Sequence, residues 1–327
     1  MNCLARAARW MAVAALLAVI AGCGRQNAPL RVGLQSWPPF EYLHLAREKG
    51  FFEAEGVDVR LIEFVEASDA FRAYDHGKLD GGTFSLMQVL RVRDSSRLKL
   101  QIAMITDYSD GQDAILARTG IDNVPGLRGK RVGVSEAPLT VYMLARALEL
   151  HGMTLEDVTL VRILDTNTTA SLRSGLIDAV ITYPPRRLQV EQEAMAHPIF
   201  TSKDIPGEIV DALAFQESIF KERPQDVARV IRAFHRAVRY TAEQPDEAMR
   251  IMAEREKVDP ETFRKSLTDG LTVAALADQQ HLLAPDSPLA QVIQRIAATM
   301  HELGVLSTAQ YGGEVLNPQG AALAVAP

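Results

Sequence analysis

Three aspartates stand out as side chains that could bind a ligand. Asp110 and Asp113 flank a Gly-Gln pair in the segment "DYSDGQDAILA", and Asp211 lies in "SKDIPGEIVDALAF" much later in the chain. Partly buried carboxylates suit a ligand amine or a cationic ring and are a poor choice for a bare anion. The alternative is structural, because aspartates also cap turns and pair with neighbouring Arg or Lys side chains.

Aromatic and hydroxyl side chains form a second candidate set, at the ends of expected strands. Trp37 lies in "SWPPFE", where it is either a flat wall for a ligand or a packing residue that closes the end of a sheet. Thr83, Phe84 and Ser85 end the strand "GGTFS", and Ser85 is also a candidate N-cap for the helix that follows. Tyr183 ends "ITY" before two prolines, which favours a position at the edge of a site.

Alternating strands and helices must position these residues. The hydrophobic periodicity predicts strands and helices in strict alternation. The expected elements are a strand at 31–35, a helix at 42–56, a strand at 57–64, a helix at 67–77, a strand at 79–84, a helix at 85–94 and a strand at 98–105. This order is typical of an α/β fold with a mainly parallel sheet.

The same order then recurs. "KRVGVSE" matches "LRVGLQS", and "TASLRSGLIDAVITY" matches "DAFRAYDHGKLDGGTF", with 98 residues between Asp80 and Asp178. The matches predict two similar α/β lobes, although any two strand-helix-strand units share some likeness. Gly77 and Gly175 are expected to end helices. The repeated aspartates start strands and are therefore expected to belong to the scaffold.

The chain is expected to pass between the lobes twice, at 107–117 and 202–215, where polar segments with glycine run into strands. Four helices with a proline near the start follow the second crossing. They are expected at 224–243, 245–256, 260–269 and 286–304. The predicted division is 30–110 plus 213–310 for the first lobe, 111–212 for the second lobe, and 311–327 for a C-terminal tail.

The first 22 residues have the pattern of a secretory signal, with two arginines, an apolar run from Trp10 to Ala21 and small residues before Cys23. The apolar run of about a dozen residues is too short to span a bilayer core as a helix. "VIAGC" resembles the lipobox of bacterial lipoproteins, which implies a lipid on Cys23, a tether at 23–29 and an extracytoplasmic, membrane-anchored protein. The alternative is ordinary cleavage nearby, with Cys23 as a bystander.

Composition excludes several classes of function. The chain is 47% hydrophobic and 23% charged, with a formal net charge of −6, so it is globular and carries no basic signature for nucleic acid. Cys3 and Cys23 are the two cysteines and the seven histidines are scattered, which leaves no zinc-ligand set and no disulfide within the mature chain. No HExxH, GxSxG, GxGxxG or phosphate-loop motif is present. The sequence therefore predicts no catalytic residue, metal or cofactor.

An ordered set of segments resembles a known family. "VGLQSWPPFEYLHLAREKGFFEAEGVDVRLIEF", "GKLDGGTFS", "DGQDAILAR", "GLIDAVITYPP" and "DIPGEIVDALAF" are similar, in this order, to type II periplasmic solute-binding proteins of ABC importers. The similarity extends over about 30–305, and its closest branch binds nitrate, sulfonates and taurine, with relatives that bind thiamine pyrimidine precursors. It implies two lobes on two hinge crossings, and a monomer that delivers a small ligand to a membrane permease and its ATPase.

The resemblance also implies site residues and leaves the ligand open. In sulfonate-binding relatives the turns after the equivalent strand carry a hydroxyl and an aromatic, which correspond to Thr140 and Tyr142. Val141 between them and Tyr183, where relatives commonly have Trp, depart from that pattern. We expect a sulfonate, a taurine-like compound or another amino-bearing or zwitterionic ligand. The alternatives are a binder of a thiamine-pyrimidine-type precursor, or a sensing lipoprotein that partners a membrane receptor.

Overall fold

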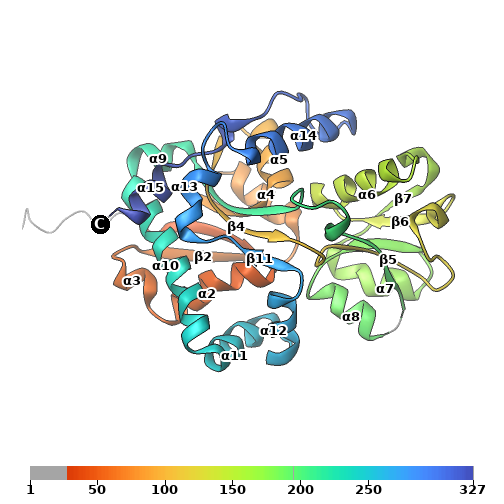
Figure 1. Cartoon of the computed structure of the whole chain (residues 1–327), viewed down its shortest axis with the longest axis horizontal. Coiled ribbons are helices and arrows are strands. Elements are labelled where there is room, and N and C mark those ends of the chain that lie inside the picture. Colours follow the sequence, from red (N-terminus) through yellow and green to blue (C-terminus); the bar gives the residue numbers. More distant parts are fainter. Residues whose placement is uncertain (1–27, 194, 327) are drawn as a thin grey trace, which may run out of the picture.

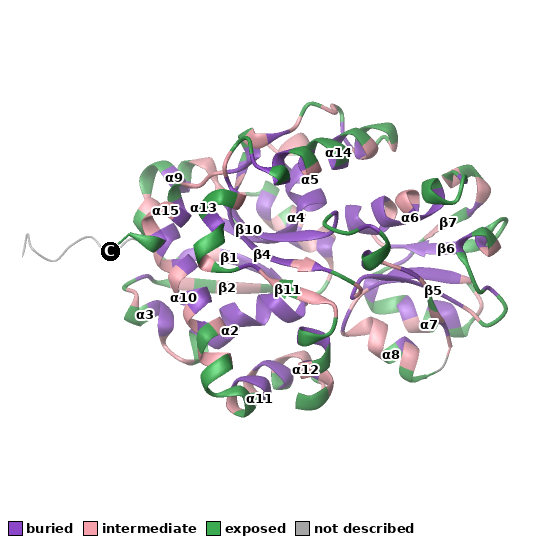
Figure 2. Ribbon diagram, viewed as in Figure 1, coloured by how far each residue is buried: buried purple, intermediate pink, exposed green. Residues whose placement is uncertain are grey.

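The computed structural model describes residues 28–193 and 195–326, so the predicted signal peptide and Cys23 lie outside the described residues. The chain forms two lobes, each with a central sheet flanked by helices (Figure 1). The inner strands and the inward faces of the helices are buried in both lobes, whereas the edge strands near 59–64 and 159–162 are partly exposed (Figure 2). Within the described part of the chain, no helix is both long enough and apolar enough to cross a bilayer.

The first lobe contains a six-stranded sheet in the order β11-β4-β10-β3-β1-β2. Its strands are β1 (Leu30–Gln35), β2 (Val59–Phe64), β3 (Gly81–Ser85), β4 (Leu100–Ser109), β10 (Val210–Gln216) and β11 (Leu271–Val273). Its helices are α2 (Glu41–Glu48), α3 (Phe51–Ala54), α4 (Ala67–Asp75), α5 (Leu86–Ser95), α9 (Glu217–Glu222), α10 (Pro224–Glu243), α11 (Pro245–Glu256), α12 (Pro260–Thr268), α13 (Gln279–Leu282), α14 (Pro288–Glu302) and α15 (Gln319–Val325).

The second lobe contains a five-stranded sheet in the order β7-β6-β8-β5-β9. Its strands are β5 (Ala114–Ala117), β6 (Arg131–Val134), β7 (Thr159–Arg162), β8 (Ala179–Thr182) and β9 (His197–Thr201), and its helices are α6 (Pro138–Leu150), α7 (Thr168–Arg173) and α8 (Arg186–Gln192). Short 3-10 turns complete the chain: η1 (Pro38–Phe40), η2 (Val124–Leu127), η3 (Leu155–Asp157), η4 (Asp165–Asn167), η5 (Ser202–Asp204), η6 (Leu276–Asp278) and η7 (Gly313–Val315).

The two-lobed α/β fold is confirmed, but each sheet is mixed rather than mainly parallel. β1 pairs in parallel with β2 and β3, and β6 pairs in parallel with β7 and β8, as the repeat predicts. The strands next to the crossings, β4, β5, β9 and β10, pair antiparallel to their neighbours, and so does β11. Strands β5 and β10 enter their sheets from the other lobe and run against the strands of the repeat, whereas β4 and β9 run in the same direction as the repeat strands.

The repeated aspartates have the same structural role in both lobes. Asp80 accepts from the backbone N–H of Arg31 at 2.8 Å and from its guanidinium, and Asp178 binds Arg131 in the same way, with the backbone bond at 2.9 Å. Each aspartate thereby ties the start of one repeat strand to the turn before another. The prediction that they belong to the scaffold is confirmed.

The two crossings are bonded to each other. One joins β4 to β5 and the other joins β9 to β10, and the hydroxyls of Ser109 and Ser202 lie 2.8 Å apart between them. The Ser202 hydroxyl also accepts from the N–H of Gly111 at 2.7 Å, and the N–H of Ser202 donates to the carbonyl of Asp113 at 2.9 Å. Because β10 begins at Val210 in the sheet of the first lobe, the second crossing ends before the predicted boundary at 212.

The segment expected as a C-terminal tail is instead part of the first lobe. Helix α15 packs along α10, with Ala321 and Ala324 buried. Gly320 permits the close approach, because a Cβ there would lie 2.7 Å from Cγ1 of Val227 and 3.2 Å from Cδ1 of Ile231. The sequence signal was weak because the run "QGAALAV" is short and made of small residues.

We expect Gly320→Val to destabilise the first lobe by about 1–3 kcal/mol, the usual cost of overpacking a tight contact. Val227 is β-branched and stiff, so it cannot move aside cheaply. Urea unfolding measures the change, and Ala322→Val, on a half-buried position of the same helix, is the matched control. Equal unfolding midpoints for the two variants would contradict the packing argument.

Candidate functional site

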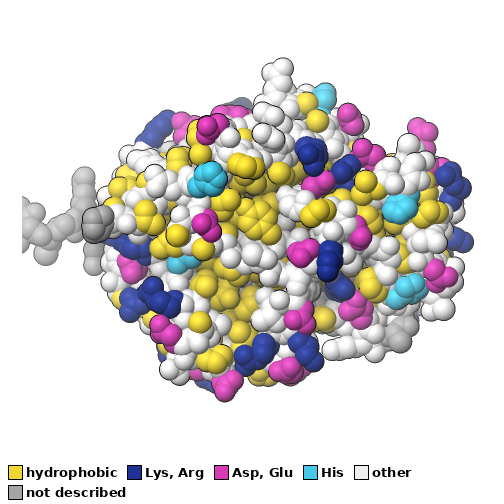
Figure 3. Space-filling view, viewed as in Figure 1, with side chains coloured by type: hydrophobic (Ala, Val, Ile, Leu, Met, Phe, Trp, Pro, Cys, Tyr) yellow, Lys and Arg dark blue, Asp and Glu magenta, His cyan; other side chains and the backbone are white. Residues whose placement is uncertain are grey.

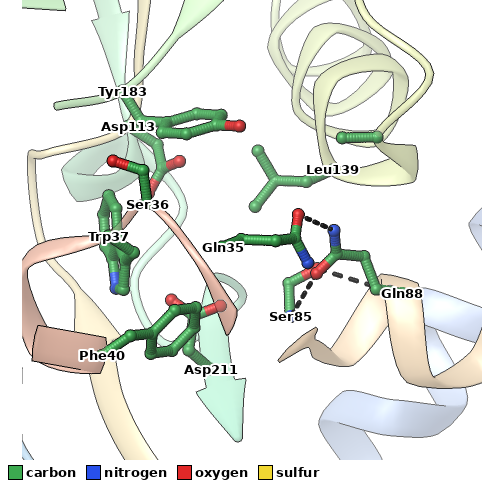
Figure 4. Close-up of a pocket in the computed structure, with 11 residues that line it drawn as sticks. Gln35, Ser36, Trp37, Phe40, Ser85, Gln88, Asp113, Leu139, Tyr183 and Asp211 are labelled. Carbon is green, nitrogen blue, oxygen red and sulfur yellow. Dashed lines mark hydrogen bonds between the residues drawn. The ribbon is translucent and has the colours of Figure 1, made fainter. Parts of the chain in front are cut away.

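A cavity of about 40 Å³ lies between the lobes, where strands of both sheets end. Eleven residues line it (Figure 4): Gln35, Ser36, Trp37, Phe40, Ser85, Gln88, Asp113, Ala137, Leu139, Tyr183 and Asp211. Strand β1, the start of α5 and strand β10 supply one side, and the start of β5, the start of α6 and the end of β8 supply the other. Because the cavity is small, a ligand of more than a few non-hydrogen atoms can enter only if the lobes part.

Three buried carboxylates gather beside this cavity. Asp211 and Asp107 are direct neighbours across the β10–β4 ladder, and Asp113 comes from the crossing between the lobes. All three are buried, and Oδ2 of Asp113 has no hydrogen-bond partner among the described residues. Like charges opposite each other in a ladder repel, so this arrangement is unfavourable for folding by itself.

Burial dominates the protonation of these groups. It raises the pKa of Asp107 to about 8, and the negative charge of Asp113 adds to the rise. It raises the pKa of Asp113 to about 6, against the effects of a hydrogen bond from Ser109 and the charge of Arg187. Burial, followed by the charges of Asp107 and Asp113, also holds the pKa of Asp211 well above its ordinary value. Burial therefore favours the protonated form of these carboxyls, and a bound cation would favour their ionised form.

Trp37 and Tyr183 form an aromatic wall that joins the lobes. The indole N–H of Trp37 donates to both carboxylate oxygens of Asp107, at 3.1 and 3.0 Å. The rings of Trp37 and Tyr183 meet edge to face, with centroids 6.0 Å apart. The Tyr183 hydroxyl donates to Oδ2 of Asp165 at 3.3 Å. Trp37 packs in the core of the first lobe and also lines the cavity, so its packing role is confirmed and its role as a wall for a ligand stays a prediction.

Polar groups of the first lobe face this wall. Ser85 caps α5 as predicted: its hydroxyl accepts from the N–H of Gln88 at 3.3 Å, and the Gln88 amide oxygen accepts from the N–H of Ser85 at 2.8 Å. The Gln88 side-chain amide donates to the amide oxygen of Gln35 at 3.1 Å. The Ser85 hydroxyl proton and the remaining amide protons are available to a ligand acceptor.

Asp107 and six lining residues were missed from the sequence. The lining residues are Gln35, Ser36, Phe40, Gln88, Ala137 and Leu139. A signal for Gln88 was present. Ser-x-x-Gln before an apolar run predicts a capping box, and because its serine ends a strand, the glutamine lies near the same end of the sheet. Asp107 had a signal too, as the first carboxylate after the apolar run "LKLQIAMIT".

Three predicted site residues of the first lobe and its crossing do not line the cavity. The Thr83 side chain is buried within β3, and Phe84 lies on the opposite face of that strand, with its ring centroid 6.3 Å from that of Tyr74. Asp110 is exposed, and its N–H donates to the carbonyl of Gly270. Alternation along the strand turns Phe84 to the other face, and Thr83, on the same face as Ser85, lies two residues before the strand end, so of these three only Ser85 reaches the cavity.

Thr140 and Tyr142 also lie elsewhere. The Thr140 hydroxyl donates to the carbonyl of Ala137 at 2.9 Å, and the Tyr142 hydroxyl donates to Oε2 of Glu208 at 2.6 Å, away from the cavity. Leu139 faces the cavity instead. Successive side chains of a helix point about 100° apart. If the correspondence with the relatives' site residues is wrong by one position, it therefore selects residues on the wrong face of the helix.

The charge of the lining decides what it can bind. The eleven lining residues, all in the described part of the chain, include no Lys or Arg. Arg187, whose charge acts on Asp113, is already bonded to the carbonyls of Gly111 and Gln112 and to Glu191. No group of three His, Cys, Asp or Glu residues among those described is placed to hold a metal ion. The cavity thus offers acceptors at its floor, donors on one side and flat apolar faces on the other.

Two lobes that meet around a cavity with apolar faces and a few polar groups define a two-lobed ligand-binding fold. The chain belongs to the NMT1/THI5 like family, whose model matches residues 37–248. The alkanesulfonate-binding protein SsuA from Xanthomonas axonopodis pv. citri, bound to MOPS, has a similar fold. It has a TM-score of 0.76 and 16% identity, and the alignment covers 89% of this chain and 99% of that one.

Sequence relatives include a binding protein and an enzyme. A Bacillus subtilis (strain 168) protein with the provisional name aliphatic sulfonates-binding protein is 25% identical over 77% of this chain and 80% of its own length. A 4-amino-5-hydroxymethyl-2-methylpyrimidine phosphate synthase from Aspergillus parasiticus is 26% identical over 65% of this chain and 66% of its own length. These relatives therefore include both a binding protein and an enzyme. The side chains of the site must be used to decide which role fits this chain.

Proposed function

We propose that this protein is the extracytoplasmic substrate-binding lipoprotein of an ABC importer, and not an enzyme. It captures a small amino-bearing or zwitterionic organic ligand between its lobes and delivers it to a membrane permease, with Cys23 as the lipid-bearing residue. The observation that carries the ligand class is the cluster of Asp107, Asp113 and Asp211 beside a cavity whose lining contains no basic side chain.

The charge argument separates the ligands that relatives suggest. A nitrate ion or a simple alkanesulfonate brings no cation to pair with Asp113 and Asp211, so it would bind only at the cost of keeping these buried carboxyls protonated. An amino-sulfonate such as taurine avoids this cost, because its ammonium can pair with the carboxylates. Its sulfonate can accept from the Ser85 hydroxyl and from the amides of Gln35 and Gln88.

Capture would occur by closure of the lobes about the two crossings. The ligand would contact Trp37 and Ser85 from the first lobe, and Leu139 and Tyr183 from the second. Contacts that exist only when both sides meet the ligand favour the closed state, which a permease can recognise. On the face seen in Figure 3, basic and acidic side chains are interspersed and form no basic patch that would suit a nucleic-acid partner.

A thiamine-pyrimidine-type precursor is the second candidate. An aminopyrimidine is flat, carries an amine and has ring-nitrogen acceptors, so it matches the Trp37–Tyr183 wall, the aspartates and the amides of Gln35 and Gln88. The synthase named above shares the family but has a different role, and in this chain no cysteine or histidine lies in the lining. We therefore propose binding, not synthesis, for this ligand class too.

A thermal-shift screen of the chain without its first 23 residues tests the proposal. We expect stabilisation by taurine, alkylamines or aminopyrimidines and none by ethanesulfonate or nitrate, which lack an amine. A ligand at 100 times its Kd should stabilise by about 2.7 kcal/mol. Tyr183→Ala should weaken any hit about tenfold by removing half of the aromatic wall, whereas Tyr183→Phe should retain it. Stabilisation by nitrate or ethanesulfonate alone would refute the amine requirement.

A further inference from the structure

One carboxylate bridges the two lobes away from the crossings. Glu66, in the loop between β2 and α4, accepts from the N–H of Asp165 at 3.1 Å and from the N–H and hydroxyl of Thr166 at 3.2 and 2.9 Å. These acceptors and donors are about one hundred residues apart in sequence and belong to different lobes. No other hydrogen bond to these two N–H groups is present among the described residues.

The contact supplies a helix cap from the opposite lobe. Turn η4 runs directly into α7, and the residue at its N-cap is Leu164, which has no side-chain acceptor. The first N–H groups of a helix need an external acceptor, and a carboxylate is a favourable one. Glu66 of the first lobe fills this role for the second lobe, and it can do so only when the lobes are together.

The contact lies at the mouth of the cleft. β2 and β7 are edge strands, each separated from the crossing strands by other strands of its sheet, and the loops that follow them hold Glu66 and Thr166. An outer cavity of about 390 Å³ is lined by Val65, Asp165 and Thr166, and it shares Ser36 with the ligand cavity. The Glu66 contact is therefore next to an outer cavity that adjoins the ligand cavity at Ser36.

The same contact reaches the aromatic wall. Oδ2 of Asp165 accepts from the hydroxyl of Tyr183, whose ring meets that of Trp37. The backbone of Asp165 is held by Glu66 while its side chain holds Tyr183. Asp165 thus links the Glu66 contact between the lobes to the position of the Tyr183 ring.

We infer that Glu66 is a latch residue, whose carboxylate caps the helix start of the second lobe and holds the two lobes closed over the ligand. This inference rests on the proposed function, since a latch at the mouth serves capture. Glu66 does not line the ligand cavity, so it acts by holding the closed form and not by selecting the ligand.

Amide hydrogen exchange at Asp165 and Thr166, read by NMR, tests the latch without an identified ligand. In Glu66→Ala both amides should exchange at least about fivefold faster than in the unmutated protein, the factor expected from the loss of a typical N-cap. In Glu66→Gln, whose side chain keeps one acceptor oxygen, the exchange rates of both amides should lie between those of Glu66→Ala and those of the unmutated protein. The exchange is measured without ligand and again with 10 mM taurine as the probe.

Glu63→Ala is the matched control, because Glu63 lies nearby on β2 but pairs with Arg255 inside the first lobe. It should leave both amides unchanged, and thermal melts should show that all variants fold. If Asp165 and Thr166 exchange in the unmutated protein as fast as in Glu66→Ala, in both conditions, the latch is refuted. Because the readout requires no ligand, it can fail while the amine screen succeeds, and the converse also holds.

Discussion

Asp211→Asn should stabilise the unliganded protein at pH 8 and at the same time weaken amine binding more than tenfold. Asp211 is buried opposite Asp107 and close to Asp113, so its carboxylate is an unfavourable group in the empty site. An asparagine there can donate to the remaining carboxylates and removes one of the mutually repelling charges. We expect a gain of about 1–2 kcal/mol, typical of neutralising a strained functional group.

The loss of binding has the opposite cause. A buried carboxylate that pairs with an ammonium contributes a charge-assisted hydrogen bond, which is worth about 1.5–3 kcal/mol. Thermal melts at pH 8 and isothermal titration with the best amine from the screen measure the two effects on the same variant. Asp110→Asn is the control, because this exposed carboxylate belongs to the same crossing and should change neither quantity by more than about 0.5 kcal/mol. A destabilised Asp211→Asn that still binds would favour the structural role for these aspartates.

The scaffold could be predicted because its signals are local or repeated. Asp80 and Asp178 follow the same pattern 98 residues apart, and each binds an arginine at the start of its lobe's first repeat strand. Helix α10 begins at the predicted proline, and Ser85 caps α5 as expected. In each case the residue type and its neighbours determine the outcome, with little contribution from distant parts of the chain.

The site was only partly predictable from the sequence. It depends on which face of a helix or strand is turned to the cavity, and on contacts between residues far apart in the chain. Thr140 and Leu139 differ by one position in α6, and the first turn alone decides which of them faces the cavity. The indole of Trp37 is oriented by Asp107, 70 residues away, and no local pattern links them. Asp113 and Asp211 were found because the crossings themselves are recognisable from glycine and proline, and the cavity lies beside them.

Binding of an amine should strengthen as the pH rises from 5 to 8. Alkylamines have a pKa near 10.4, so the ligand stays charged over this range. The site changes instead, since the pKa of Asp113 is about 6 and that of Asp107 is about 8. Protonated carboxylates do not attract the ammonium, so binding below these values must displace a proton. We expect the affinity to rise by up to about tenfold per pH unit for each proton displaced, more steeply below the pKa of Asp113 than above it, and to level off only above pH 8.

The stability of the empty protein should change in the opposite direction. A carboxyl whose folded pKa lies above its unfolded value of about 3.9 contributes stability below that value, and the contribution is lost as the pH rises through the folded pKa. The buried imidazoles of His44 and His235, whose pKa values burial lowers to about 3 and about 4, act in the opposite direction up to their unfolded value of about 6.5. Melting temperatures of the unliganded protein should therefore fall between about pH 6.5 and pH 8, while the stabilisation by ligand grows.

Titration calorimetry in two buffers of different ionisation enthalpy counts the protons released and so tests this coupling directly. Asp113→Asn should flatten the pH profile near 6, because it removes the group that titrates there. Asp107→Asn is informative in a different way, because its amide oxygen can still accept from the Trp37 indole while the charge is gone. A profile that is flat in the unmutated protein, with no proton release, would mean that these carboxylates are already ionised and that the cavity accommodates their charge without a cation.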